Sequence, residues 1–299
     1  MRIIEADAMG MCFGVRDALE AARGVERPVE MTVFGELVHN PEVTGELHRR
    51  GFALLREEER TVKNVHTPRV MITAHGVSER ERARLVASGK ELLDTTCPLV
   101  NKAHKAARAL ARAGFFVVVA GRRGHVEIAG ITGDLDAGGF VVVERPGEVV
   151  FYGARRIAVM AQTTSVEPEV RAIVEMVRVM NPASEVRFVN TICRPTRERQ
   201  AALERLIEKV TVLVVVGGRH SNNTRQLAAR GREAGRRVIH LEAAAELRPG
   251  MFSGSDTVGM TAGTSTPEET IQAVRDRLAS LAADVMVSSP VRGPVMRVA

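Results

Sequence analysis

Short apolar runs that end in polar loops recur along the chain and predict parallel β-strands. The runs are Met31–Phe34, Val70–Thr73, Phe115–Ala120, Ile157–Met160, Val210–Val216 and Thr257–Met260. Stretches with helical periodicity separate them, and strands that alternate with helices are typical of α/β folds with parallel sheets. No apolar run approaches the roughly 18 residues that a membrane-spanning helix needs. We therefore expect a globular α/β protein without a membrane segment.

The same pattern begins three times, and each time it starts at a cysteine. Cys12, Cys97 and Cys193 each stand in a short loop just before a helical stretch. A strand and a polar loop follow each helix, and the central residues of these loops, 27 or 28 positions after the cysteine, are His39, His125 and Ser221. The loops after the second strand of each repeat contain His75, Thr163 and Ser265. Ligands of open parallel sheets bind at the carboxyl ends of the strands, where all six loops fall.

This repeat divides the chain into three similar α/β units. We expect them at residues 1–97, 98–192 and 193–282, followed by a C-terminal tail at 283–299. The units could lie side by side with separate sites. Closure around a pseudo-threefold axis, however, is the arrangement that gives three isolated cysteines at equivalent positions a shared purpose. We therefore predict that the cysteines converge on a central cavity.

Charge and composition narrow the choice of partners. The formal net charge is +6, but the basic residues are dispersed, and the chain has no Trp and one Tyr. A base-stacking surface for RNA is therefore not expected, although a basic RNA-binding protein is a rival interpretation. The positive charge favours anionic partners. The N-terminus lacks the long apolar segment of a signal peptide, so we expect a cytoplasmic protein.

Three converging thiolates can hold either of two kinds of metal centre. They could bind zinc with water in the fourth position. They could also bind three irons of a cubane iron–sulfur cluster, which would leave the fourth iron open to a substrate oxygen. The spacing of the cysteines does not distinguish these centres. An open cluster could serve a reductase or an aconitase-like hydro-lyase, which moves water without net electron transfer.

The polar loops around the cysteines predict an anionic substrate. Neutral or weakly basic donors suited to a diphosphate are His39, His75, His125, Ser221, Asn222, Asn223 and Ser265. Glu127 is the carboxylate at the centre of the second unit's loop. Beside an open metal it could deliver protons, through Thr163.

Taken together, these motifs resemble the 4-hydroxy-3-methylbut-2-enyl diphosphate reductase family. The matching pieces are Gly10-Met11-Cys12-Phe13-Gly14-Val15, Val38-His39-Asn40, Ala74-His75-Gly76-Val77-Ser78, Thr96-Cys97-Pro98-Leu99-Val100, Gly124-His125-Val126-Glu127, Gln162-Thr163-Thr164, Cys193, Ser221-Asn222-Asn223 and Ala262-Gly263-Thr264-Ser265. They occur in the order of the family, from about residue 9 to 267.

The resemblance implies a trefoil of three α/β domains around one 4Fe–4S cluster that has three cysteine ligands, Cys12, Cys97 and Cys193, and one open iron. It implies an iron–sulfur oxidoreductase that converts the allylic diphosphate to isopentenyl and dimethylallyl diphosphate and water. His39, His75, Ser221, Asn223 and Ser265 would hold the diphosphate, with His125 also near the substrate. Glu127 would supply protons, and Thr163 would lie beside the substrate hydroxyl.

The resemblance also implies partners. The electron donor would be a one-electron carrier such as ferredoxin or flavodoxin, and we expect a monomer or a weak dimer without nucleic acid or membrane. The chain departs from the family at Met11, where Phe is frequent, at Val126, where Pro is usual, and at Asn222, where a second Ser is usual. Because Asn keeps a donor and an acceptor, we expect diphosphate binding to survive the change at 222.

Overall fold

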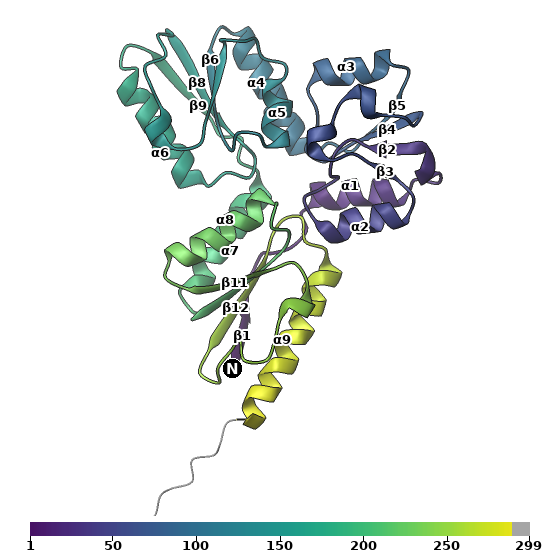
Figure 1. Cartoon of the computed structure of the whole chain (residues 1–299). Helices are drawn as coiled ribbons and strands as arrows, with labels where there is room; N and C mark the ends of the chain where they lie inside the picture. Colours follow the sequence, from purple (N-terminus) through teal and green to yellow (C-terminus); the bar gives the residue numbers. More distant parts are fainter. Residues whose placement is uncertain (289–299) are drawn as a thin grey trace, which may run out of the picture.

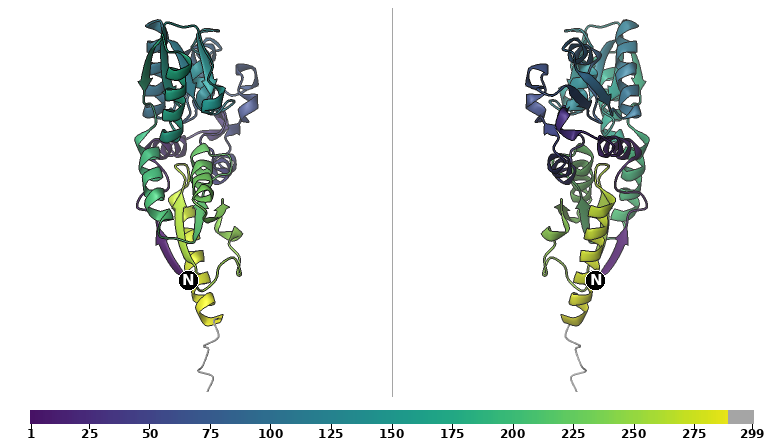
Figure 2. Two further views of the ribbon diagram at one scale, coloured as in Figure 1. Left: turned by 90° about the vertical axis from the view of Figure 1, so that its left-hand side faces the viewer. Right: turned by 90° about the vertical axis from the view of Figure 1, so that its right-hand side faces the viewer.

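The computed structural model describes residues 1–288 and has three lobes, each built on its own four-stranded parallel sheet (Figure 1). The sheet orders are β3-β2-β4-β5, β7-β6-β8-β9 and β1-β12-β10-β11. Viewed from the side, the molecule is much thinner than it is broad (Figure 2). The predicted α/β class with three small parallel sheets is confirmed.

The helices and strands have the following bounds. The first lobe contains α1 (Phe13–Arg23), β2 (Met31–Val33), α2 (Pro41–Arg49), β3 (Ala53–Leu54), β4 (Arg69–Ile72), α3 (Glu79–Ala87) and β5 (Glu91–Asp94). The second contains α4 (Pro98–Arg112), β6 (Phe116–Ala120), α5 (Val126–Thr132), β7 (Phe140–Val143), β8 (Arg156–Ala161), α6 (Glu167–Met180) and β9 (Glu185–Val189). The third contains α7 (Arg194–Ile207), β10 (Val212–Val216), α8 (Asn222–Glu233), β11 (Arg237–Leu241), β12 (Thr257–Ala262), α9 (Glu268–Ser288) and the first strand of the chain, β1 (Arg2–Glu5).

Each sheet is covered by two helices on one face and one helix on the other. In the third lobe, Leu213 and Val215 of β10 pack with α7 and α8, whereas Val212, Val214 and Val216 pack with α9. Successive side chains of a strand point to opposite faces, so a continuous run of Val fills both layers. In the other two lobes, α1 and α2, and α4 and α5, form the paired layer, and α3 and α6 stand alone opposite them.

The N-terminal strand lies in a different lobe from the one we predicted. We placed residues 1–97 in the first unit, but β1 pairs in parallel with β12, with Arg2 opposite Thr257 and Glu5 opposite Met260. The strand therefore completes the third sheet in the way that β5 and β9 complete the first and second sheets. The three edge strands, each just ahead of a cysteine, are absent from our predicted order of elements.

The other predicted boundary that differs is the one at residue 283. Helix α9 continues to Ser288, so 283–288 are part of this helix rather than of a tail. The remainder of the predicted tail lies outside the described residues. None of the described helices is both long and apolar enough to cross a membrane.

Candidate functional site

Each of the three cysteines is the N-cap residue of a helix. Cys12 precedes α1, Cys97 precedes α4 and Cys193 precedes α7, and none of the three side chains caps its own helix. Each thiol is therefore free to point away from the helix that follows it. The N-terminus of a helix carries free N–H groups and a partial positive charge, which favour a thiolate there.

The backbone of each cysteine is also held in the same way. The N–H of Cys12 donates to the Thr264 carbonyl at 3.0 Å, after β12. The N–H of Cys97 donates to Ala74 at 3.1 Å, after β4, and that of Cys193 donates to Thr163 at 2.9 Å, after β8. Every cysteine thus stands where the chain leaves the edge strand of one sheet and enters the first helix of the next unit.

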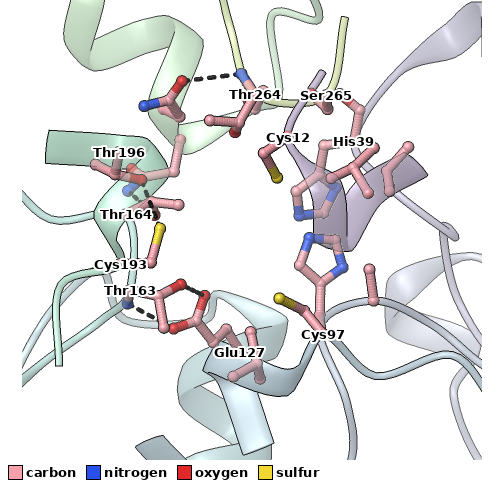
Figure 3. A pocket seen from close by; sticks show the side chains of 18 of the residues that line it. Cys12, His39, Cys97, Glu127, Thr163, Thr164, Cys193, Thr196, Thr264 and Ser265 are labelled. Atoms are coloured by element: carbon pink, nitrogen blue, oxygen red, sulfur yellow. Dashed lines mark hydrogen bonds between the residues drawn. The ribbon is translucent and has the colours of Figure 1, made fainter. Parts of the chain in front are cut away.

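These three crossings converge on one cavity. The sulfur atoms of Cys12, Cys97 and Cys193 face its centre from different sides (Figure 3). The predicted convergence of the cysteines is confirmed. All three are free thiols.

At least two of the three cysteine sulfurs lie more than 4.8 Å apart. Among residues 1–288, the His, Cys, Asp and Glu side chains whose ligand atoms all lie within 4.8 Å of one another are His39, Glu57 and His75, and the three cysteines do not form such a group. Two thiolates on one tetrahedral zinc, with bonds of about 2.3 Å, would have their sulfurs roughly 3.8 Å apart. In this structure the three sulfurs are therefore not all placed for one tetrahedral zinc ion.

Burial disfavours the thiolate form of Cys97 and Cys193. Burial raises the pKa of Cys97, and it raises the pKa of Cys193 to about 11, although Thr196 forms a 3.0 Å hydrogen bond with the Cys193 sulfur. These groups are protonated at neutral pH and lose their protons when a metal binds. Soft sulfur donors of this kind suit both an iron–sulfur centre and zinc.

Two glycines permit the close approach of the units at this cavity. A Cβ atom on Gly14, in the first turn of α1, would lie 2.4 Å from the Cys97 sulfur. A Cβ atom on Gly218, after β10, would lie 2.5 Å from the His39 carbonyl oxygen. A side chain at either position would force two units apart.

Three histidines form one side of the cavity. The rings of His39 and His75 stack with their centroids 4.3 Å apart, and His125 meets both rings edge-on at 5.2 and 5.7 Å. Burial lowers the pKa of His75 and lowers that of His125 to about 3. The Glu127 N–H donates to Nδ1 of His125 at 3.1 Å, so the neutral ring carries its proton on Nε2.

His39, by contrast, is paired with an acid. Its Nδ1 lies 2.8 Å from a carboxylate oxygen of Glu36, and this hydrogen bond lowers the pKa of Glu36. Glu57 is likewise occupied, because it accepts from the Glu36 N–H at 2.9 Å and from Arg60 at 3.2 Å. His39 and Glu57 of this group are therefore already hydrogen-bonded to other residues of the protein.

Glu127 is the buried acid of the cavity. Its side chain comes from the first turn of α5 and is 2% exposed. The backbone N–H and the hydroxyl of Thr163 donate to its two oxygens at 2.7 and 2.9 Å. Burial raises the pKa of Glu127 to about 7 in spite of these two donors. A carboxyl group that titrates near neutrality can act as a proton donor.

The third unit adds neutral donors and a helix N-terminus. Ser221 is the N-cap residue of α8, and Asn223 in the first turn accepts from the Thr264 N–H through Oδ1 at 3.0 Å. The Nδ2 donor of Asn223 is buried without a hydrogen-bond partner in the structure, as is Nδ1 of His75. Buried polar groups are nearly always paired. These unpaired atoms therefore indicate a polar ligand.

Asn222 and Ser265 link the units around the cavity. Asn222 donates through Nδ2 to the Thr164 hydroxyl at 2.9 Å, which joins the third unit to the second. The Ser265 hydroxyl donates to the His39 carbonyl at 3.3 Å, and the Ser265 carbonyl accepts from Asn40 at 2.9 Å. Both side chains line the cavity, but part of their hydrogen-bonding capacity is used within the protein.

The structure brings every residue of the predicted site to this one cavity, while the individual roles stay predictions. The cavity-lining set includes Cys12, His39, His75, Cys97, His125, Glu127, Thr163, Cys193, Ser221, Asn222, Asn223 and Ser265. Thr164, Thr196 and Thr264 also line it, but they were not predicted as site residues. Thr196 lies in the first turn after Cys193, and a hydroxyl at that position was a signal for a contact with the cysteine.

Comparison with known proteins gives consistent results. The family model described as "LytB protein" matches residues 3–279. A 4-hydroxy-3-methylbut-2-enyl diphosphate reductase of Caldanaerobacter subterraneus subsp. tengcongensis is 33% identical over 94% of this chain and 98% of its own length. The Aquifex aeolicus enzyme of the same name is 34% identical over 96% of this chain and 99% of its own length.

Two solved structures are also similar. The chain superposes on a structure of (E)-4-hydroxy-3-methyl-but-2-enyl diphosphate reductase, the terminal enzyme of the non-mevalonate pathway, with a TM-score of 0.66. The two are 30% identical over 94% of this chain and all of that one. The Plasmodium falciparum E-1-hydroxy-2-methyl-but-2-enyl-4-diphosphate reductase gives a TM-score of 0.83 at 23% identity, over 97% of this chain and 89% of that one, and so shares the fold.

Proposed function

Because the chain belongs to the LytB family, we propose that it is a 4-hydroxy-3-methylbut-2-enyl diphosphate reductase, an iron–sulfur oxidoreductase of isoprenoid precursor synthesis. The reaction uses two electrons and two protons. It removes the allylic hydroxyl as water and yields isopentenyl or dimethylallyl diphosphate. The observation that carries the proposal is the convergence of three equivalent cysteines on a cavity lined with histidines and a buried acid.

The cofactor of the proposed reaction is one 4Fe–4S cluster held by Cys12, Cys97 and Cys193. The position of the sulfurs, of which at least two lie more than 4.8 Å apart, supports a cluster in which each thiolate binds its own iron over a single zinc ion. When bound, the cluster would supply electrons one at a time and an open iron that acts as a Lewis acid toward the substrate oxygen.

The protein's own contribution to the reaction begins with the diphosphate. His39, His75, Ser221, Asn223 and Ser265 would hold it, together with Asn222. The unpaired Nδ2 of Asn223 and the N-terminus of α8 offer donors and positive potential to phosphate oxygens. The Nε2–H of His125 supplies a further neutral donor.

Glu127 would deliver the protons. Its pKa near 7 leaves a substantial protonated fraction at neutral pH, and its hydrogen bonds to Thr163 fix the direction of both oxygens. Thr163 would stand between the acid and the substrate hydroxyl. Because both groups are buried, water competes little for the transfer.

Electrons would come from a one-electron carrier such as ferredoxin or flavodoxin. The net charge of +6 is complementary to an acidic carrier. We place the protein in the cytoplasm, because free thiols and an oxygen-sensitive cluster suit a reducing compartment. We expect it to be a monomer or a weak dimer.

The test is anaerobic turnover of the allylic diphosphate with a chemical one-electron reductant, after reconstitution with iron and sulfide. We expect a brown protein that consumes two electrons per product. A colourless protein that binds zinc would refute the cluster. A brown protein that eliminates or adds water without consuming electrons would instead be a hydro-lyase.

A further inference from the structure

Arg199 is a buried cation beside two of the cysteines. It lies on α7, six positions after Cys193, and is 7% exposed. Other arginines of this helix are exposed and paired with acids, as Arg194 is with Glu198 and Arg205 with Asp7. Among the described residues, Arg199 has no ion-pair partner. A buried charge without a counter-charge costs several kcal/mol, roughly, in real proteins.

Two backbone carbonyls hold the guanidinium in place. Nε and one terminal nitrogen of Arg199 donate to the Gly10 carbonyl at 2.9 and 2.8 Å, and the other terminal nitrogen donates to the Pro195 carbonyl at 3.0 Å. Gly10 comes two residues before Cys12, and Pro195 comes two residues after Cys193. One side chain therefore bridges two cysteine loops from different parts of the chain.

The loop at Gly10 has little freedom to release this contact. Gly10 adopts the left-handed conformation with a φ of 76°, and a Cβ atom there would lie 2.4 Å from Ile271. Its N–H donates to the Ala262 carbonyl at 3.1 Å. The carbonyl that receives Arg199 is thus fixed by the packing of the third sheet.

Two of the negative groups that act on Arg199 are cysteines of the cavity. Burial lowers the pKa of Arg199, and negative charge on neighbouring groups opposes this shift, in the order Cys12, Glu198 and Cys193. A guanidinium remains protonated in proteins, so the positive charge is permanent. Glu198 is already paired with the exposed Arg194, so the buried counter-charges left for Arg199 are the thiolates that Cys12 and Cys193 would carry as cluster ligands.

We propose that Arg199 is the buried counter-charge of the iron–sulfur centre and raises its reduction potential. This inference rests on the cluster of the proposed function. A four-iron cluster with three thiolates is anionic, and each added electron makes it one unit more negative. A fixed cation in a medium of low dielectric constant stabilises the more negative state more strongly. Arg199 is a positioning residue rather than a catalytic one, because it acts on the cluster through its charge.

Two substitutions separate the charge from the hydrogen bonds. Arg199→Gln keeps a donor for the Gly10 carbonyl but removes the charge. Arg199→Lys keeps the charge but cannot donate two hydrogen bonds to the Gly10 carbonyl in the way that the guanidinium does. Arg197→Gln is the matched control, because Arg197 lies two residues away on the same helix and is exposed to solvent, so it undergoes the same loss of charge outside the buried site. The measurement is an anaerobic redox titration of the reconstituted proteins, followed by electron paramagnetic resonance of the reduced cluster.

We expect Arg199→Gln to lower the ratio of reduced to oxidised cluster at a fixed potential by tenfold or more, a shift of about 59 mV for one electron. In Arg199→Lys and Arg197→Gln, the ratio of reduced to oxidised cluster at the same potential should stay within about threefold of its value in the parent protein. An unchanged potential in Arg199→Gln would overturn the proposal. If Arg199→Gln and Arg199→Lys both fold but both lose the cluster, the proposal is also overturned, because the guanidinium would then only hold the geometry of the site. A parent protein that takes up no cluster would instead refute the proposed function.

Discussion

The backbone N–H and hydroxyl of Thr163 both donate to the carboxylate of Glu127, at 2.7 and 2.9 Å. One residue therefore orients both oxygens of the buried acid. These donors favour the ionised form, but burial outweighs them and raises the pKa of Glu127 to about 7. The pair sets both the direction of the acid and the pH at which it can give up a proton.

Replacing Glu127 by Gln removes the proton but keeps the shape of the side chain. We expect Glu127→Gln to retain the cluster spectrum and substrate affinity, and to lose about 10²–10⁴ in turnover rate. Single-turnover measurements under anaerobic conditions check this. A rate like that of the parent protein would remove Glu127 from the proton path.

The pH dependence of turnover should report the same group. Glu127 is a proton donor in its protonated form, which predominates below its pKa. The rate should therefore fall as the pH rises through about 7. Thr163→Val removes a donor that favours the ionised form, so it should raise the pKa and move this limb to higher pH. Thr132→Val, the same exchange at the other end of α5, should leave the limb in place.

Gly14 lies where two cysteine loops meet, and a side chain there should prevent cluster assembly. Its Cβ would lie 2.4 Å from the Cys97 sulfur. Gly14→Ala should lose most bound iron and sulfide after reconstitution while the protein remains helical by circular dichroism. Gly24→Ala is the control at the other end of α1, because its Cβ would come no closer than 3.5 Å to the atoms around it. Full iron content in Gly14→Ala would contradict the ligand assignment of Cys97.

A negative charge at position 223 should strongly weaken binding of the diphosphate substrate. Asn223→Asp keeps the oxygen that accepts from the Thr264 N–H, but it replaces the unpaired Nδ2 donor by a carboxylate oxygen facing the diphosphate. We expect the dissociation constant for the substrate to rise by about 100-fold or more, since each 1.4 kcal/mol is tenfold. Asn64→Asp makes the same charge change at an exposed position. Calorimetric titration measures both, and equal affinities would exclude Asn223 from the diphosphate site.

The pairing of β1 with the third sheet gives a prediction about stability. Ile4 packs against the layer of α7 and α8, whereas Arg2 on the same strand is exposed. Ile4→Asp should lower the melting temperature by about 5 °C or more, because a charge replaces an apolar contact. Arg2→Asp should have little effect. A similar small effect of both changes would mean that β1 contributes little to the third lobe.

The sequence allowed the six junctions between apolar strands and polar loops to be predicted, because a buried parallel strand is a continuous apolar run. The edge strands could not be recognised in the same way. Arg2–Glu5, Glu91–Asp94 and Glu185–Val189 are half-buried and carry charged residues at their ends, so each resembles a loop. Their shared position just ahead of a cysteine was the missed signal.

The candidate site was predictable where polar residues interrupt the apolar pattern, as at His75 and Glu127. Arg199 was not, because an arginine in an arginine-rich amphipathic helix looks like any other solvated residue. Only the packing of α7 against the Gly10 loop makes it a buried cation. The separation of the cysteine sulfurs likewise depends on how three units meet, which no local pattern encodes.

The position of β1 also has a consequence for the order of maturation. During synthesis β1 and Cys12 leave the ribosome first. Strand β12 emerges near the end of synthesis, yet it pairs with β1, and the loop after it accepts the backbone N–H of Cys12. Cys97 and Cys193 have their anchoring strands already behind them when they emerge. The ligand made first is therefore positioned last, and cluster insertion must wait until almost the whole chain has been synthesised.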